Sequence, residues 1–281
     1  MSDSLPVVAA VQMVSKANIH DNLESARRLI AEAAARNAQL VLLPENFAVL
    51  DGGPLQQYGE IEGASQTLLQ RFLAEQAKIH RLILVAGTIP LLSRPGKPDE
   101  ILTDGRVRPA CLVYGRDGAV LARYDKMHLF DVTVEDRQAE YSESRSFEPG
   151  DELATVKTDL GHLGLSICYD LRFPELYRRL RESGAELITV PSAFTHTTGK
   201  AHWEPLLRAR AIENQCYVIA ANQGGIHNER RETWGHSMIV DPWGTVLDCI
   251  PSGEGIAVAG IDLALLRKIR HNMPVMSHRR I

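Results

Sequence analysis

Gly118-Ala119-Val120-Leu121 and Gly244-Thr245-Val246-Leu247 are matching stretches whose first residues, 118 and 244, lie 126 positions apart in a chain of 281 residues. The glycine that begins each stretch is the last residue of a turn. The turns are Arg116-Asp117-Gly118 and Asp241-Pro242-Trp243-Gly244, and each follows a short apolar run. Such turns between apolar runs are typical of β-hairpins. A feature that occurs twice at so long a spacing does not indicate a solenoid. It predicts two similar halves, each containing a hairpin.

The segments before the two hairpins show the same order of expected elements. Short runs of β-branched and small apolar residues indicate buried strands, and apolar residues at intervals of three and four indicate helices. In the first half we expect strands at 7–13, 40–43 and 82–89, helices at 21–36 and 65–80, and a hairpin at 111–114 and 119–121. In the second half we expect strands at 163–167, 187–190 and 217–221, helices at 174–183 and 203–215, and a hairpin at 238–240 and 245–247.

This repeated order predicts the α/β fold class. Each half would form one mixed sheet with helices on one face, and the other face would stay apolar and bare. Packing the two bare faces together buries both and produces a four-layer α-β-β-α sandwich of two similar mixed sheets. Two ordinary doubly wound sheets joined by a linker are the alternative. Because no Pro/Gly/Ser-rich linker separates the halves, we expect a single domain over residues 1–281.

Composition is that of an ordinary globular protein, with 44% hydrophobic and 23% charged residues. The 31 basic and 35 acidic residues are evenly mixed, so neither nucleic acid nor a membrane surface is expected as a partner. No apolar run approaches the roughly 20 residues of a membrane helix, and Met1–Pro6 lacks the features of a signal peptide. Four cysteines without a C-x-x-C pair or zinc-finger spacing are typical of a reducing compartment. We therefore expect a cytoplasmic protein with no metal.

Several familiar motifs are missing from the chain. It contains no G-x-G-x-x-G, no G-x-x-x-x-G-K-[ST], no H-E-x-x-H and no G-x-S-x-G. Nucleotide binding, zinc-dependent hydrolysis and serine esterase chemistry therefore lose their support, and no cofactor is expected.

Residues capable of chemistry follow several expected strands, where α/β sheets bind their ligands. Glu45 follows the strand at 40–43 between apolar residues, and a desolvated carboxylate there is suited to act as a general base. Lys126 follows the first hairpin among apolar and aromatic residues, so it would be held inward and would need an anionic partner. Glu143 lies in the polar segment 127–151. A segment of this length is usually either functional or disordered, and its position just after Lys126 favours a function. Spacing alone does not distinguish Glu143 from a surface residue.

Cys168 is the candidate nucleophile. It lies between the strand at 163–167 and a helix that Pro174 suits as a first-turn residue. The dipole and backbone N–H groups of such a turn favour a thiolate. The other cysteines lie within apolar patterns and are expected to be inert core thiols; they are Cys111, Cys216 and Cys249.

Three motifs resemble the Glu, Lys and Cys signatures of the nitrilase, or carbon–nitrogen hydrolase, superfamily. They are Leu43-Pro44-Glu45-Asn46, Tyr124-Asp125-Lys126-Met127-His128-Leu129 and Cys168-Tyr169-Asp170-Leu171-Arg172-Phe173-Pro174-Glu175. The resemblance continues through 191–194, 198–204, 208–213, 235–238 and 241–244, and thus covers nearly the whole chain. It implies the α-β-β-α sandwich and an assembly of two or more copies.

The resemblance also implies roles for the candidate residues. Cys168 would attack the carbonyl carbon of an amide, and Glu45 would take its proton. Lys126 and the backbone N–H of Tyr169 would stabilise the oxyanion. Glu143 would be the second glutamate of the family, holding Lys126 or the substrate in place.

Branches of the superfamily that match the Cys168 motif are mostly amidases of small carboxylate-bearing substrates. Arg172 could fork onto such a carboxylate, or it could form an ion pair with Glu175 or another helix carboxylate. The segment 193–200 follows the strand at 187–190 and is expected to line the substrate pocket; its candidate binding residues are Phe194, Thr195 and Thr198. In the alternative interpretation this segment only caps the sheet.

Other interpretations remain open. A papain-type Cys–His pair would need one of His128, His196, His202 or His236, but none has the surrounding sequence of such an enzyme. An N-carbamoyl amino acid hydrolase would use the same three motifs. A catalytically dead binding protein would be expected to have lost Glu45, Lys126 or Cys168, and all three are present.

Overall fold

The computed structural model describes residues 5–65 and 67–281. Residues 1–4 of the segment tested for a signal peptide, and residue 66 of the helix expected at 65–80, lie outside the described residues.

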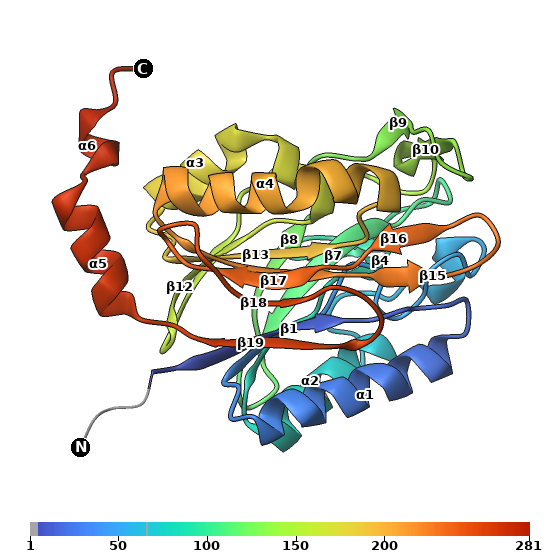
Figure 1. Cartoon of the computed structure of the whole chain (residues 1–281). Helices are drawn as coiled ribbons and strands as arrows, with labels where there is room; N and C mark the ends of the chain where they lie inside the picture. The colour runs from blue at the N-terminus through green and yellow to red at the C-terminus, as the bar shows by residue number, and fades with distance from the viewer. Residues whose placement is uncertain (1–4, 66) are drawn as a thin grey trace.

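Two large sheets and four helices form the body of the molecule. The first sheet contains β1 (Val7–Gln12), β2 (Leu40–Leu42), β3 (Ile83–Val85), β4 (Ile89–Leu91), β7 (Arg108–Tyr114), β8 (Val120–Asp125) and β19 (Gly255–Gly260). The second contains β11 (Thr155–Thr158), β12 (Gly161–Leu165), β13 (Leu187–Ser192), β14 (Tyr217–Asn222), β17 (Ser237–Val240) and β18 (Val246–Ile250). Helices α1 (Ile19–Ala35) and α2 (Leu69–His80) lie outside the first sheet, and α3 (Pro174–Glu182) and α4 (His196–Asn214) lie outside the second (Figure 1). The four-layer α-β-β-α sandwich is therefore confirmed.

The two halves repeat the same topology, as the matched hairpins predict. The order β1-α1-β2-α2-β3-β7-β8 in the first half corresponds to β12-α3-β13-α4-β14-β17-β18 in the second. In each sheet the first three strands of this order are parallel neighbours, and an additional antiparallel strand lies beside the first of them. That strand is β19 in the first sheet and β11 in the second. Because β19 comes from the C-terminal end, the last strand of the chain completes the first sheet.

Strand β1 shows why the expected strands are continuous apolar runs. Val8 and Ala10 contribute to a core cluster shared with the second sheet, whereas Ala9 and Val11 pack into a cluster with α1 and α2. A strand that is buried on both faces has no polar side to display. The shared cluster is what one domain requires, although the single domain stays a prediction.

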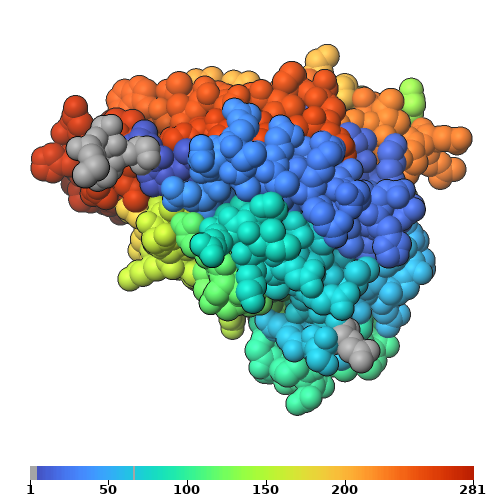
Figure 2. Space-filling view, turned by 90° about the horizontal axis from the view of Figure 1, so that it is seen from below, coloured from blue at the N-terminus to red at the C-terminus, as the bar shows by residue number. Residues whose placement is uncertain are grey.

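Smaller elements surround the sandwich. Three ribbons pair β5 (Ser93–Arg94) with β6 (Lys97–Ile101), β9 (Asp131–Thr133) with β10 (Glu140–Ser142), and β15 (Gly224–Ile226) with β16 (Glu232–Trp234). The short 3₁₀ helices are η1 (Leu55–Tyr58), η2 (Glu143–Arg145) and η3 (Cys168–Arg172). Helices α5 (Leu263–Asn272) and α6 (Val275–His278) follow β19 and lie to one side of the sheets (Figure 1). Figure 2 shows the opposite side from α3 and α4, where the segments that contain α1 and α2 form the surface. Within the described part of the chain, no helix is long and apolar enough to span a membrane.

Two elements differ from expectation in ways that shape the site. Helix α4 begins at His196 rather than at 203, because the Thr195 side chain accepts a hydrogen bond from the Thr198 N–H and caps the helix there. The strand expected at 82–89 is divided into β3 and β4. Between them Gly87 has φ 62°, and a Cβ atom at this position would lie 2.0 Å from the carbonyl oxygen of Pro44. Only glycine permits this close approach, which holds the backbone just before Glu45.

Candidate active site

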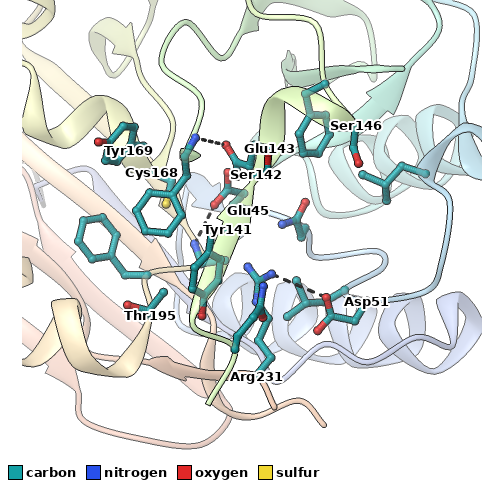
Figure 3. A pocket seen from close by; sticks show the side chains of 18 of the residues that line it. Glu45, Asp51, Tyr141, Ser142, Glu143, Ser146, Cys168, Tyr169, Thr195 and Arg231 are labelled. Atoms are coloured by element: carbon teal, nitrogen blue, oxygen red, sulfur yellow. Dashed lines mark hydrogen bonds and ion pairs between the residues drawn. The ribbon is translucent and has the colours of Figure 1, made fainter. Parts of the chain in front are cut away.

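Loops from both halves bring Glu45, Glu143 and Cys168 to one cavity (Figure 3), and Lys126 is buried beside it between the two carboxylates. Glu45 follows β2, Lys126 follows β8, and Cys168 follows β12 at the start of η3. Glu143 begins η2, directly after β10. The first half thus supplies the ammonium and one carboxylate, the second half supplies the thiol, and the polar segment between the halves supplies the second carboxylate.

Lys126 is fully buried between the two carboxylates. Its Nζ donates hydrogen bonds to Glu45 Oε1 at 2.8 Å and to the two carboxylate oxygens of Glu143 at 2.9 and 2.7 Å. Burial alone would lower the pKa of Lys126, but Glu143 and Glu45 outweigh that effect and hold the pKa well above its ordinary value. Lys126 therefore remains an ammonium group in the resting site.

The second oxygen of each carboxylate is also held. Glu45 Oε2 accepts a hydrogen bond from the Ala193 N–H at 3.0 Å, and Glu143 Oε2 accepts one from the Phe130 N–H at 2.8 Å. Gln223 donates its Nε2 to the backbone oxygen of Glu45 at 3.1 Å. These contacts fix the orientation of both carboxylates before any substrate arrives, as preorganised catalysis requires.

Cys168 adopts a backbone conformation that is rare for a residue with a side chain. Its φ is 47°, in the left-handed region, and a non-glycine residue there costs on the order of 1 kcal/mol or more. Such strain persists only where the surroundings determine it. Here the turn is held by a residue two positions further on, Asp170.

Asp170 connects the Cys168 turn to the Lys126 segment, and sequence reasoning did not assign it a role. Its fully buried carboxylate accepts hydrogen bonds from the Ile167 N–H at 2.8 Å and from the Tyr124 hydroxyl at 2.7 Å. It also accepts one from the His128 N–H at 3.1 Å and lies 2.7 Å from His128 Nδ1. Tyr124 and His128 each lie two residues from Lys126, so one side chain sets the relative position of nucleophile and ammonium. An acidic residue two positions after the candidate nucleophile, within the same short turn, is the signal that could have revealed it.

The expected stabilisation of a thiolate at Cys168 is wrong for the resting site. Burial and, next, the negative charge of Glu45 raise the pKa of the Cys168 thiol well above its ordinary value, although Lys126 acts in the opposite direction. Cys168 begins a short 3₁₀ helix, and α3 begins only at Pro174, so the dipole of that helix acts from a distance. This direction of the pKa shift favours the protonated thiol at neutral pH, so Cys168 would need a nearby base in order to act as a nucleophile.

The cavity has a volume of about 220 Å³. Besides Glu45, Glu143 and Cys168 it is lined by Tyr169, whose backbone N–H is the predicted oxyanion donor. It is also lined by the three candidate binding residues Phe194, Thr195 and Thr198. Other lining residues come from the segment after Glu45, from the β9–β10 region and from the loop before β16; among them are Val49, Asp51, Leu55, Tyr141, Phe147 and Arg231. Sequence reasoning missed Asp51, Tyr141 and Arg231, since none belongs to the three motifs.

Arg172 does not line the cavity. Its guanidinium carbon lies 5.8 Å from the centre of the Tyr169 ring and 5.3 Å from that of Phe194, and its Nη1 is 3.2 Å from His202 Nδ1. Arg172 therefore packs against the side chains of Tyr169 and Phe194, which line the cavity. A direct contact between Arg172 and a substrate carboxylate stays a prediction.

The four histidines considered as partners for Cys168 lie elsewhere. His128 is engaged by Asp170 and stacks on Phe173, and His202 lies beside Arg172. His196 and His236 both contact the Trp234 ring. None of the described residues that line the cavity is a histidine, so the papain-type arrangement has no support here. In residues 5–65 and 67–281, no group of three or more His, Cys, Asp or Glu side chains is arranged to hold a metal ion.

The loop between β15 and β16, which carries Arg231, is anchored by a buried histidine. His227 Nδ1 lies 2.7 Å from the Ser15 carbonyl oxygen and its Nε2 lies 2.7 Å from the Thr233 hydroxyl. Because the Ser15 carbonyl can only accept, Nδ1 carries the proton and neutral Nε2 accepts from Thr233. Burial lowers the pKa of His227 from 6.5 to about 4. The neutral form therefore stabilises this loop.

We expect this histidine to make folding pH-dependent. A histidine whose pKa is lower in the folded state contributes its full stability above pH 6.5 and loses it as the pH falls toward about 4. The loss approaches about 3 kcal/mol, because each pKa unit corresponds to about 1.4 kcal/mol. Urea unfolding between pH 7.5 and 4 measures it. His227→Gln should flatten this slope, while His20→Gln, at an exposed position of α1, should retain it. An unchanged slope in His227→Gln would contradict the assignment.

The sandwich fold and a cavity lined by a thiol and by two carboxylates that hold a buried ammonium are features of one class of enzyme, the hydrolases of carbon–nitrogen bonds. Residues 7–271 match the carbon–nitrogen hydrolase family. The chain belongs to this family and is a hydrolase of carbon–nitrogen bonds.

Named relatives are similar over nearly the full chain. A deaminated glutathione amidase of Yersinia enterocolitica is 41% identical over 273 residues, which are 97% of this chain and 92% of the relative. A deaminated glutathione amidase of Homo sapiens is 41% identical over 99% of this chain and 84% of the relative. The crystal structure of the C. elegans NitFhit protein superimposes with a TM-score of 0.86 at 38% identity; all of this chain is covered, but it spans only 66% of that protein.

Proposed function

We propose that this protein is an amidase that works through a thioester at Cys168. The observation that carries the proposal is the buried Lys126 ammonium, hydrogen-bonded to Glu45 and Glu143 in the site whose cavity holds the Cys168 thiol. This arrangement supplies a nucleophile, a base and a fixed positive charge for the oxyanion.

The reaction would proceed in two stages. Cys168 Sγ attacks the amide carbonyl carbon while Glu45 takes the thiol proton, and the oxyanion is stabilised by Lys126 and the backbone N–H of Tyr169. Glu45 then gives that proton to the nitrogen as the C–N bond breaks, so the amine leaves and the acyl group remains as a thioester. In the second stage Glu45 takes a proton from water as the water attacks the thioester. The C–S bond then breaks, and the proton returns to Cys168. Glu143 holds Lys126 in position throughout.

We further propose deaminated glutathione as the substrate, cleaved to 2-oxoglutarate and cysteinylglycine. In this substrate the α-amino group of glutathione is replaced by a keto group. The names of the relatives support this assignment. Three stretches resemble the same branch: Pro191–Phe194, Cys216–Gly224 and Met273–Arg280. In the first of them the ω-amidase branch tends to carry Gly in place of Ser192.

An ω-amidase acting on α-ketoglutaramate is the nearest alternative. Both substrates would leave the same 2-oxoglutaryl group on Cys168, so the two activities differ only in the leaving group, which is a dipeptide amine or ammonia. Some cross-activity is therefore expected, and the preference must come from contacts to the departing dipeptide. An N-carbamoyl amino acid hydrolase and a catalytically dead binding protein are further alternatives.

We expect kcat/KM for deaminated glutathione to exceed that for α-ketoglutaramate by about tenfold or more, because only the first offers a leaving group that the cavity can bind. Release of 2-oxoglutarate measures both reactions on one enzyme preparation. A preference for α-ketoglutaramate would move the assignment to ω-amidase. Turnover of an N-carbamoyl amino acid alone would favour that hydrolase, and no turnover of any of the three would favour the binding protein.

We also propose that the protein acts in the cytoplasm as a homodimer or higher homo-oligomer. The assembly of other family members supports the oligomer. The four cysteines, all free thiols in the structure, support a reducing compartment.

A further inference from the structure

Arg231 is the one basic side chain among the described residues that line the cavity. It comes from the loop between β15 and β16, outside all of the family motifs named above. Lys126 provides the other positive charge of the site, but two carboxylates already surround it. A carboxylate on a bound substrate therefore has Arg231 as its available positive partner in the cavity.

The protein itself does not saturate the Arg231 guanidinium. Nη1 lies 3.7 Å from Asp51 Oδ1, which is an ion pair beyond hydrogen-bond distance, and Nε has no hydrogen-bond partner. Asp51 Oδ2 instead accepts a hydrogen bond from Asn228 Nδ2 at 2.8 Å. Asp51 thus balances the charge of Arg231 without accepting a hydrogen bond from the planar set of guanidinium donors, which are suited to a carboxylate.

Tyr141 and the loop backbone hold Arg231 in place. The guanidinium carbon lies 5.6 Å from the centre of the Tyr141 ring, within the range of a cation–π contact. The Arg231 N–H donates to Asn228 Oδ1 at 2.8 Å, and the same asparagine contacts Asp51. The Arg231 side chain is only 16% exposed. Its position is therefore fixed before a ligand arrives, which lowers the entropic cost of binding.

The position of Glu45 indicates which end of the substrate Arg231 meets. In the proposed reaction Glu45 must protonate the amide nitrogen, so the leaving group lies on the Glu45 side of Cys168. Asp51 is six residues beyond Glu45 in the same segment. In Figure 3, Cys168 and Tyr169 lie on one side of Glu45, and Asp51 and Arg231 lie on the other. The acyl group would instead lie toward Tyr169 and Thr195.

We propose that Arg231 binds the terminal carboxylate of the leaving dipeptide and thereby determines the preference for a peptide-like amine over ammonia. This inference rests on the proposed function, since it requires a leaving group that ends in a carboxylate. It makes Arg231 a specificity-determining residue on the leaving-group side of the cavity. The acyl group left on Cys168 is the same for both substrates, so the acyl side of the cavity cannot set this preference.

The test combines a change in the enzyme with a change in the substrate. Steady-state kinetics are measured for the wild type, Arg231→Gln and Arg230→Gln. The three substrates are deaminated glutathione, its C-terminal amide, and α-ketoglutaramate. Arg230 is the matched control, since it is an exposed arginine on the same loop that does not line the cavity. Circular dichroism and the melting temperature check that each variant folds.

For the wild type, we expect amidation of the substrate carboxylate to lower kcat/KM by about 10- to 100-fold, the effect of losing a charge-assisted hydrogen-bonded pair. With deaminated glutathione, kcat/KM of Arg231→Gln should be lower than that of the wild type by a similar factor. This variant should have similar kcat/KM values for deaminated glutathione and for its C-terminal amide. Its loss with α-ketoglutaramate should be at least tenfold smaller. Arg230→Gln should behave as the wild type does.

Other results would overturn the inference. If amidation has no effect on the wild type, or if Arg231→Gln loses the same factor with all three substrates, Arg231 does not bind the dipeptide carboxylate, and the proposed amidase function stands. If Arg231→Gln does not fold, the comparison of acid and amide on the wild type, repeated with Arg231→Lys, decides the question in the same way. Turnover of none of the three substrates by the wild type would overturn the proposed substrate as well.

Discussion

Cys168→Ala is expected to lower the rate of amide hydrolysis by about 10⁴- to 10⁶-fold, because removal of a nucleophile abolishes every step that passes through its covalent intermediate. The loss should appear in kcat. Cys168 is nearly buried, at 7% exposure, and only a thiol is removed, so the free energy of unfolding should change by about 1 kcal/mol. Release of 2-oxoglutarate measures the rate, and urea unfolding measures the stability.

A second measurement identifies the intermediate itself. Wild-type enzyme quenched in acid during turnover should carry a 2-oxoglutaryl group on the peptide that contains Cys168, detectable by mass spectrometry, and Cys168→Ala should carry none. Cys249→Ala is the matched control, because Cys249 is a half-buried thiol in β18 that does not line the cavity. Hydrolysis by Cys168→Ala within tenfold of the wild type would refute the thioester mechanism.

Glu45→Gln is expected to lower kcat by about 10³-fold or more. The amide keeps the shape of the carboxylate and can still accept the Lys126 hydrogen bond, so the change removes the base and the acceptor for the Ala193 N–H. General acid–base catalysis typically contributes 10²- to 10⁴-fold, and the high pKa of the Cys168 thiol makes the reaction depend on a base for its first proton transfer. Single-turnover kinetics with deaminated glutathione measure the effect on formation of the thioester.

The same variant should change the titration of the thiol in the opposite sense. Burial contributes most to the raised pKa of Cys168, and the charge of Glu45 contributes next. Removing that charge while Lys126 remains should lower the thiol pKa. The pH dependence of alkylation by iodoacetamide should therefore move to lower pH in Glu45→Gln. A variant that keeps near wild-type turnover, or whose thiol titrates at higher pH, would show that Glu45 is not the base beside Cys168.

The repeated topology could be predicted from the sequence because it depends on local patterns. Strands buried on both faces must be apolar throughout, and the helices beside them must carry an apolar stripe, so both leave a signal in the chain. Each of the two hairpins contains residues typical of turns, such as Asp117-Gly118 in the first. Expected and observed bounds differ most at α4, since the cap provided by Thr195 is a contact rather than a periodicity.

Part of the site was equally predictable. Glu45, Lys126 and Cys168 each follow a strand, where α/β sheets bind their ligands. That Cys168, from the second sheet, meets Glu45 and Lys126, from the first, depends on how the two sheets pack. Glu143 could be named only by resemblance, because it lies in a segment without periodicity. Glu143 and Lys126 are 17 positions apart in the chain, and no pattern at short spacing predicts a contact between them.

By itself, the sequence determined the layered fold, the family and the residues of the three motifs, because each of these depends on residue types at short spacings. The tertiary structure alone decided the direction in which the pKa of Cys168 is shifted, the connection made by Asp170 and the place of Arg231 in the cavity. These properties depend on burial and on charges brought together from distant segments: Arg231 meets Asp51 across 180 positions (231 − 51) of the chain. An electrostatic interaction depends on distance in space and on the surrounding dielectric, and neither quantity is defined until the two sheets have packed together.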